Sequence, residues 1–473
     1  MVTAETVAGR PFEANGFCHD VVVGNWLVAR EPGRIIRAMQ IHRRWFLLLL
    51  FGWAIGAAAQ DSKPSTNYVL KVTPDRADAL YKVGEPVTFH LELTLDKQPV
   101  PDAEVQWTLT QDGVPPTTSG KVKLAAGSAS VTGKLDAPGF LQCRAQFTSA
   151  EKRSYSGLGG AGFEPTKIKP SLPVPADFDA FWAAQKKLLA AVPVNARLTP
   201  VKQAAAGVQA FDLQADSVGA PVSGYFARPE GAKPKSLPII LTVHGAGVRS
   251  SSLGGATGWA KQNFLALDIN AHGLPNGQPD KFYSDLAAGD LKDYRTRGRE
   301  SRDTVYFRGM FLRLVRALDF LCAQPEWDGK TVVVFGASQG GFQAIVAAGL
   351  DARVTFFAAG VPAGCDHTGF KAGRINGWPK FIAAGEEPAA NVLDAVRYYD
   401  AMNFATRTKA EAIFTVGFID TTCPPSSVYA AYNNVSGQKS IHHDPDAGHT
   451  STPKAGEAMR KAVQEHLKRQ AAK

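Results

Sequence analysis

The fold is decided by the stretch Thr331-Val332-Val333-Val334-Phe335-Gly336-Ala337-Ser338-Gln339-Gly340-Gly341, which leads into a helix-forming segment over 342–350. The apolar, β-branched run at its start is typical of a buried strand. The glycines on both sides of Ser338 allow a tight turn, and the residues that follow favour a helix. The pattern therefore predicts a strand, a sharp turn and a helix in direct succession, with Ser338 at the apex of the turn.

Apolar runs alternate with helix-length segments on both sides of this stretch, over residues 170–471. The helical pattern is clearest at 305–322 and 453–471. Such alternation is typical of an α/β domain with a mostly parallel sheet. The predicted strands cover 239–243, 264–268, 331–335, 355–359, 412–416 and 439–443.

Residues 66–160 follow a different pattern, in which apolar and polar residues alternate one by one, as in the run 87–96. This alternation predicts strands with one buried face, and we expect a small all-β sandwich, immunoglobulin-like in outline. The unit could bind carbohydrate, but it has no cluster of Trp and Tyr, which favours a spacer or an oligomerisation domain. The glycine-rich segment 154–162 predicts a linker, so we expect the sandwich to fold by itself and to leave the pocket to the second domain.

The segment 1–59 is interpreted as an upstream extension followed by a secretory signal peptide. His42, Arg43 and Arg44 precede an apolar run over 45–55, and Ala57-Ala58-Ala59 fits the rule for signal-peptide cleavage. The apolar run is short of the roughly 20 residues that a membrane-spanning helix needs. We therefore expect Met39 to be the true start, the mature chain to begin near Gln60, and the protein to be periplasmic or extracellular, with no membrane attachment after cleavage.

The composition excludes several classes of function. The 473 residues carry a formal net charge of +9 without a block of five or more Lys or Arg, which argues against a nucleic-acid partner. The five cysteines form no Cys-x-x-Cys pair and no Cys/His cluster, so the sequence predicts neither a zinc site nor a disulfide framework and leaves any pairing open. They are Cys18, Cys143, Cys322, Cys365 and Cys423.

The turn around Ser338 has the Gly-x-Ser-x-Gly pattern of a nucleophile elbow, in which the serine hydroxyl is exposed between a strand and a helix. A serine hydroxyl needs a general base, and the base needs a carboxylate to orient it. His449 and Asp420 each follow a predicted strand and lie after the serine, in the order acid then histidine. The rival bases are His442, His443, His367 and His466, and the rival acids are Asp444 and Asp446.

A second small-residue turn follows the strand 239–243 and reads His244-Gly245-Ala246-Gly247. In an acyl-transfer site, two backbone N–H groups stabilise the negative oxygen of the tetrahedral intermediate. One donor comes from the residue after the nucleophile and the other from a loop after an early strand. We therefore expect the N–H groups of Gln339 and Ala246 to form the oxyanion hole.

Residues of about 170–470 resemble the acetyl xylan esterase and cephalosporin C deacetylase family, carbohydrate esterase family seven. The resemblance is carried by Pro175-Ala176-Asp177-Phe178-Asp179-Ala180-Phe181-Trp182, by the Ser338 motif, by Gly417-Phe418-Ile419-Asp420-Thr421-Thr422-Cys423-Pro424-Pro425, and by Gly448-His449. It implies an α/β-hydrolase fold and a triad of Ser338, Asp420 and His449. The sequence departs from the family at Ala246, where many members have an aromatic residue, and at Asp268-Ile269-Asn270-Ala271-His272-Gly273.

Together with the predicted signal peptide, the resemblance implies a secreted serine esterase that needs no metal or cofactor and removes acetyl groups from xylan or acetylated oligosaccharides through an acyl-enzyme. It also raises the expectation of a homo-oligomer. The alternatives are a general short-chain carboxylesterase, a carbohydrate esterase acting on feruloyl or glucuronoyl esters, and a catalytically idle carbohydrate-binding protein. The complete triad argues against the idle alternative.

Overall fold

A computed structural model describes residues 67–472 apart from 116–117 and 203–204. The predicted signal peptide, the start at Met39 and Cys18 lie outside these residues. Within them, no helix combines the length and apolar character needed to cross a membrane. The contacts of the chain group Pro64–Lys473 into one compact unit.

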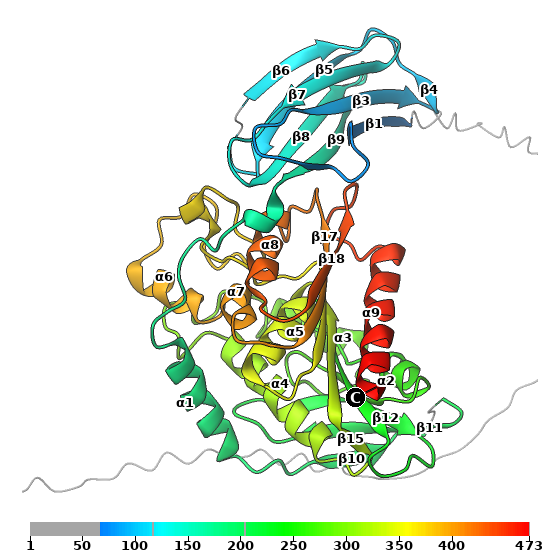
Figure 1. The fold of residues 1–473 in the computed structure, drawn as a ribbon, viewed down its shortest axis with the longest axis vertical. Coiled ribbons are helices and arrows are strands. Elements are labelled where there is room, and N and C mark those ends of the chain that lie inside the picture. The colour runs from blue at the N-terminus through cyan, green and yellow to red at the C-terminus, as the bar shows by residue number, and fades with distance from the viewer. Residues whose placement is uncertain (1–66, 116–117, 203–204, 473) are drawn as a thin grey trace, which may run out of the picture. The chain divides into compact units, whose positions relative to one another are not determined.

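A nine-stranded sheet forms the centre of the C-terminal two-thirds of the chain (Figure 1). Six neighbouring strands, β14, β13, β15, β16, β17 and β18, are parallel to one another. The strands β10, β11 and β12 extend one edge of the sheet in antiparallel fashion. The prediction of a mostly parallel α/β sheet is therefore confirmed. In spatial order the strands are β10 (Arg197–Pro200), β11 (Val208–Ala215), β12 (Val222–Pro229), β14 (Leu265–Ile269), β13 (Leu237–Val243), β15 (Trp327–Ala337), β16 (Phe356–Gly360), β17 (Glu411–Gly417) and β18 (Lys439–Asp444).

Helices cover both faces of this sheet, which explains why its central strands are almost wholly apolar. On β13, Ile239 and Leu241 face the core shared with α4 and α5, whereas Ile240 faces the core shared with α2 and α9. Figure 1 shows α9 on one side of the sheet and α4 and α5 on the other. The helices are α1 (Phe178–Ala190), α2 (Leu253–Ala260), α3 (Asp280–Ala288), α4 (Phe307–Cys322), α5 (Gln339–Leu350), α6 (Ala390–Arg397), α7 (Ala401–Ala405), α8 (Pro425–Asn434) and α9 (Pro453–Ala471), with 3₁₀ turns η1 (Pro165–Lys167) and η2 (Gly369–Ala372).

The N-terminal part folds into two further sheets that share a separate apolar core. Because alternate residues of β3 are fully buried and the others are not, the period-two pattern located this strand correctly. The immunoglobulin-like outline stays a prediction. One sheet contains β1 (Tyr68–Pro74), β3 (Val87–Leu95), β4 (Gln98–Pro99) and β7 (Ser128–Gly133), and the other contains β2 (Leu80–Tyr81), β9 (Ser154–Phe163), β8 (Gly139–Thr148), β5 (Glu104–Gln111) and β6 (Thr118–Lys123).

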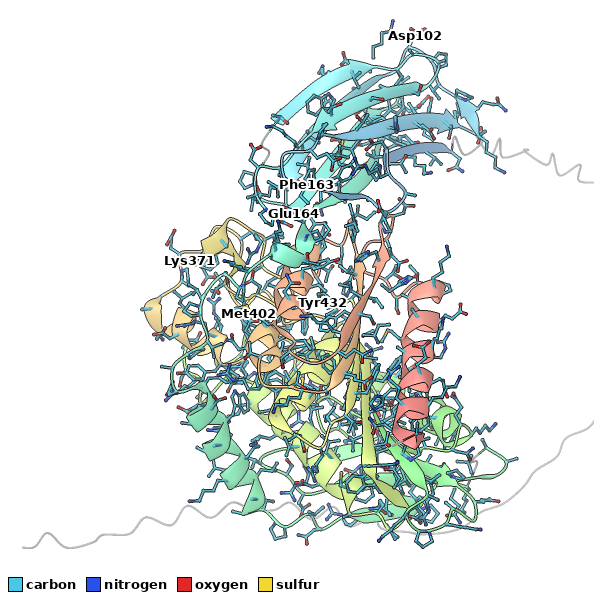
Figure 2. The ribbon with its side chains drawn as sticks, in the orientation of Figure 1. Asp102, Phe163, Glu164, Lys371, Met402 and Tyr432 are labelled. Carbon is cyan, nitrogen blue, oxygen red and sulfur yellow. The ribbon has the colours of Figure 1, made fainter. Side chains whose placement is uncertain are left out.

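The prediction of a linker over 154–162 is wrong, because these residues form β9, which pairs with β8 along its whole length. The glycines serve close packing here. A Cβ atom on Gly157 would lie 2.5 Å from the carbonyl oxygen of Leu70. Figure 2 labels Phe163 and Glu164, where β9 ends and the chain enters η1. The β-rich part is therefore followed directly by η1, and the glycine-rich stretch is a paired strand of its sheet.

Two helical glycines allow the close packing of α5 on α7 to be tested. A Cβ atom on Gly349 of α5 would lie 2.6 Å from the carbonyl oxygen of Phe404, whereas a Cβ atom on Gly258 of α2 would meet no atom within 4 Å. We expect Gly349→Ala to lower the free energy of unfolding by about 1–3 kcal/mol through overpacking. We expect Gly258→Ala to leave it unchanged or to raise it by up to about 1 kcal/mol, since alanine favours helix. Chemical denaturation measures both, and equal effects would contradict the packing of α5 on α7.

Candidate active site

Ser338 lies at the turn between β15 and α5 with a backbone φ of 56° and ψ of −122°. A positive φ is costly for a residue with a side chain, and it persists only where the surroundings hold it. The Ser338 N–H donates to the carbonyl oxygen of Gly360 at 2.8 Å, and its own carbonyl accepts from the N–H of Ala363 at 3.0 Å. The neighbouring strand β16 and the residues after it thus hold the strained turn that the Gly-x-Ser-x-Gly pattern predicted.

Ser338, His449 and Asp420 lie in one hydrogen-bonded row. Ser338 Oγ is 2.9 Å from His449 Nε2, and His449 Nδ1 is 2.8 Å from Asp420 Oδ2. Because a carboxylate accepts, Nδ1 carries the proton and Nε2 is left to accept from the serine hydroxyl. Residues 111 and 29 positions apart in the sequence are therefore brought together in the geometry that a nucleophile, a base and an orienting acid require.

The carboxylate of Asp420 is held by the backbone that follows it. Its Oδ1 accepts from the N–H groups of Thr422 and Cys423, each at 2.8 Å, while Oδ2 faces the histidine. The residue is only 1% exposed, so its carboxylate depends on these donors in place of water. The turn Asp420-Thr421-Thr422-Cys423 thus fixes which oxygen is available to His449.

The rival residues have other partners. His442 Nε2 lies 3.3 Å from Asp444, and His443 Nε2 lies 2.5 Å from the hydroxyl of Tyr429. Both histidines are half-buried. His367 is buried against the backbone of Tyr399, His466 contacts Thr355 and Glu411 in the core, and Asp444 accepts from Thr452. Asp446 is exposed.

The small-residue turn after β13 lies beside the serine. A Cβ atom on Gly245 would be 3.6 Å from Ser338 Cβ. The guanidinium of Arg249 folds back on this turn and donates to the carbonyl oxygens of Gly245, at 3.1 Å, and of Ala246. Since Gln339 is the first residue of α5, its N–H has no acceptor within the helix. The two predicted oxyanion donors, Ala246 and Gln339, therefore come from segments that meet at Ser338.

Tyr294 was not among the site residues predicted from the sequence. Its hydroxyl donates to Gln339 Oε1 at 2.9 Å. The tyrosine is 6% exposed and packs its ring 4.7 Å from that of His272. It lies in an irregular segment between α3 and α4, where no hydrophobic period reports burial. Only the departure at 268–273 pointed toward this region, because it contains His272.

Two histidines link the oxyanion turn to the segment after β14. His244 Nε2 accepts from the N–H of Ala271 at 3.1 Å, so its Nδ1 carries the proton and donates to the carbonyl oxygen of Gly245 at 2.6 Å. Burial lowers the pKa of His244 to about 4. Burial, with the nearby His244 and Arg313, lowers the pKa of His272 to about 3. Both rings are therefore neutral near pH 7.

Within the described residues, Asp420, Cys423 and His449 are the group whose possible metal-donor atoms lie within 4.8 Å of one another. Asp420 and His449 already bind each other. Burial raises the pKa of the Cys423 thiol well above its usual value, with Asp420 adding to the effect, and this disfavours the thiolate that a metal would need. The arrangement fits an oriented acid–base pair better than a metal site. Cys143, Cys322, Cys365 and Cys423 form no disulfide.

The family model described as acetyl xylan esterase (AXE1) matches residues 164–466. The acetyl esterase Axe7A of Xylanibacter ruminicola is 32% identical over 414 residues, which cover 86% of this chain and 92% of that protein. Since residues 164–473 make up only about two-thirds of this chain, the likeness to Axe7A extends into the β-rich part.

Solved structures resemble a smaller share of the chain. The acetyl xylan esterase from Paenibacillus sp. R4 is 29% identical with a TM-score of 0.57, and the match covers 64% of this chain and 98% of that one. Acetyl xylan esterase 1 from Thermoanaerobacterium sp. JW/SL YS485 is 23% identical with a TM-score of 0.55, over 63% of this chain and 96% of that one, and it shares the fold. The predicted α/β-hydrolase fold is confirmed by these likenesses.

The neutral histidines predict a loss of stability in mild acid. An unfolded histidine titrates near pH 6.5. Below that pH the unfolded chain takes up protons that native His244 and His272 accept only near pH 4 and 3, so the free energy of unfolding is at its full value above about pH 6.5 and falls toward pH 4. We expect His272→Gln to reduce this slope, and His90→Gln, at an exposed position of β3, to leave it unchanged. Denaturant unfolding at several pH values measures the slope, and an unaltered slope in His272→Gln would contradict the assignment.

Proposed function

Because this chain belongs to the acetyl xylan esterase family and is therefore a carboxylic ester hydrolase, we propose that it removes acetyl groups from xylan or acetylated oligosaccharides by a Ser338–His449–Asp420 triad. The single observation that carries the proposal is the row of hydrogen bonds from Ser338 through His449 to Asp420, at 2.9 Å and 2.8 Å. The names of the relatives support the acetyl ester as the substrate.

In the first half of the reaction, Ser338 Oγ attacks the carbonyl carbon of the acetyl group while His449 Nε2 takes the hydroxyl proton. The carbonyl oxygen becomes negative and is bound by the N–H groups of Gln339 and Ala246, each contributing about 3 kcal/mol to the barrier reduction. Collapse of this intermediate breaks the bond to the sugar oxygen. That oxygen receives the proton from His449 and leaves as a hydroxyl group, and the acetyl group stays on Ser338.

In the second half, His449 Nε2 takes a proton from water, and the hydroxide oxygen attacks the acetyl carbon. The same N–H groups bind the second oxyanion. Acetic acid then leaves and ionises to acetate in solution, and Ser338 Oγ recovers its proton from His449. Throughout, Asp420 holds the Nδ1 proton in place and stabilises the imidazolium that forms twice per cycle.

The alternative functions differ in the esters that the protein would cleave. A general carboxylesterase would cleave butyryl esters as fast as acetyl esters, a feruloyl or glucuronoyl esterase would prefer those larger esters, and an idle carbohydrate-binding protein would cleave none. Relative rates on acetyl, butyryl, feruloyl and glucuronoyl esters distinguish them. A polymeric substrate also fits the predicted signal peptide, and we propose a periplasmic or extracellular location.

Removal of the nucleophile gives the decisive test. We expect Ser338→Ala to lower the rate on p-nitrophenyl acetate and on acetylated xylan by about 10⁴–10⁶-fold, since triad residues act as a unit. The fold should persist, because the turn is held by backbone bonds. Ser284→Ala, at an exposed position of α3, serves as the control and should retain the full rate. More than a tenth of the original rate in Ser338→Ala would refute the proposal.

Tyr294→Phe tests the support of the oxyanion donor. Loss of the hydroxyl leaves the buried Oε1 of Gln339 without its hydrogen-bond donor, and a hydrogen bond of this kind contributes about 1 kcal/mol. We expect kcat to fall about fivefold with little change in KM. Tyr283→Phe is a matched control, because Tyr283 is also 6% exposed and its hydroxyl binds the carbonyl oxygen of Pro275. If both variants keep the original kcat, Tyr294 does not position Gln339.

A further inference from the structure

The segment Gly417–Asp420, which ends at the triad acid, is bound on one side by the segment that carries His449. The Phe418 N–H donates to the carbonyl oxygen of Asp444, and the Ile419 N–H donates to that of Ala447, each at 3.2 Å. The acid and the base are therefore attached to two strand-end segments that bind each other.

On its other side, the same segment is covered by the β-rich part of the chain. A Cβ atom on Gly160 of β9 would lie 2.5 Å from the carbonyl oxygen of Phe418, so the two backbones are in direct contact. Gln142 Nε2 of β8 donates a long hydrogen bond, 3.5 Å, to that oxygen. The rings of Phe140 and Phe418 meet edge to face with centroids 5.0 Å apart.

The residues that form this contact are buried from solvent. Phe140 and Phe418 are both 0% exposed, Gln142 is 5% exposed, and Phe140 belongs to the same apolar core as the α/β strands. Asp112, which follows β5, is 1% exposed. Burial raises the pKa of Asp112 to about 6, while Ser426 of α8 and Arg374 act in the opposite direction. Phe140 thus packs directly on Phe418, two residues before the acid, and Asp112 lies near α8.

We propose that β8 and β9 position the triad acid, with Gly160 and Gln142 as positioning residues that fix the Phe418 carbonyl and through it the distance between Asp420 and His449. This inference rests on the proposed function. It replaces the expectation that the β-rich part folds by itself and leaves the active site to the second domain. A displacement of about 1 Å in a catalytic group can cost about 100-fold in rate, so a contact two residues from Asp420 has room to act.

The structure of the Paenibacillus esterase matches a smaller share of this chain. It is matched over 98% of its length by 64% of this chain, so it holds no counterpart to about a third of this chain. Here, by contrast, Phe418 has its whole side chain buried, with Phe140 of β8 against its ring. Removing that cover would expose an apolar ring beside the acid.

Two glycines on the same strand give a matched experiment in the full-length protein. Gly160→Ala places a methyl group 2.5 Å from the carbonyl oxygen of Phe418, and Gly157→Ala places one 2.5 Å from that of Leu70, inside the β-rich part. Both should destabilise the fold to a similar degree. We expect only Gly160→Ala to lower kcat on p-nitrophenyl acetate, by about 10- to 100-fold with KM little changed, when both are assayed well below their unfolding temperatures.

A second pair avoids any dependence on the glycine variants folding. Gln142→Glu keeps the shape of the side chain but replaces the donor to Phe418 with an acceptor, and Gln146→Glu makes the same change at an exposed position of β8. We expect about a tenfold fall in kcat for Gln142→Glu and none for Gln146→Glu. The rate at which an organophosphate ester inactivates Ser338 should fall in parallel, because it reports the reactivity of the serine and not substrate binding.

The outcomes separate the two proposals. If Gly160→Ala and Gln142→Glu keep the kcat and the inactivation rate of the original protein, or if Gly157→Ala and Gln146→Glu lose them equally, the positioning role is wrong while the esterase proposal stands. If Ser338→Ala retains activity on the same ester, the proposed function itself fails. A fall confined to Gly160→Ala and Gln142→Glu supports positioning.

Discussion

The rest of the site depends on the hydrogen bond of 2.8 Å between His449 Nδ1 and Asp420 Oδ2. It joins the segments after β17 and β18, and it needs both the parallel register of those strands and the backbone donors of Thr422 and Cys423. It also fixes the histidine proton on Nδ1, so that Nε2 faces the serine. The hydroxyl at the strained turn of Ser338 can donate its proton only when that nitrogen lies within hydrogen-bonding distance.

The three residues of the proposed triad were predictable from sequence because each lies just after a strand. Ser338 and Asp420 each follow an apolar strand, His449 follows the mixed strand β18, and parallel strands bring their carboxyl ends to one edge of the sheet. The central strands were predicted well because burial on both faces leaves them almost wholly apolar. The antiparallel edge strands β10, β11 and β12 were missed, since they carry mixed sequences such as Arg197–Pro200 that no single period describes.

The contacts that support the site could not be read in the same way. Tyr294 lies in an irregular segment, and only the folded chain brings its hydroxyl to Gln339, 45 residues away. The stretch 154–162 was misread for a physical reason: glycine is equally suited to a flexible linker and to a strand whose backbone touches another backbone. Its true role appears only when Leu70 and Phe418 are placed against it.

The contact between Phe140 and Phe418 joins the core of the α/β part to the β-rich part. Burying one aromatic side chain contributes about 2 kcal/mol, and both rings here are fully buried. Once the surface beside the acid is apolar, the bare hydrolase would expose it to water, and the segment 417–420 would lose the atoms that oppose its movement away from His449. The hydrogen bonds to Asp444 and Ala447 hold that segment from the side of the base alone. Two opposed contacts restrict a backbone more than one does, which is the physical basis for the proposed role of the β-rich part in positioning Asp420, although it supplies no atom of the proposed triad.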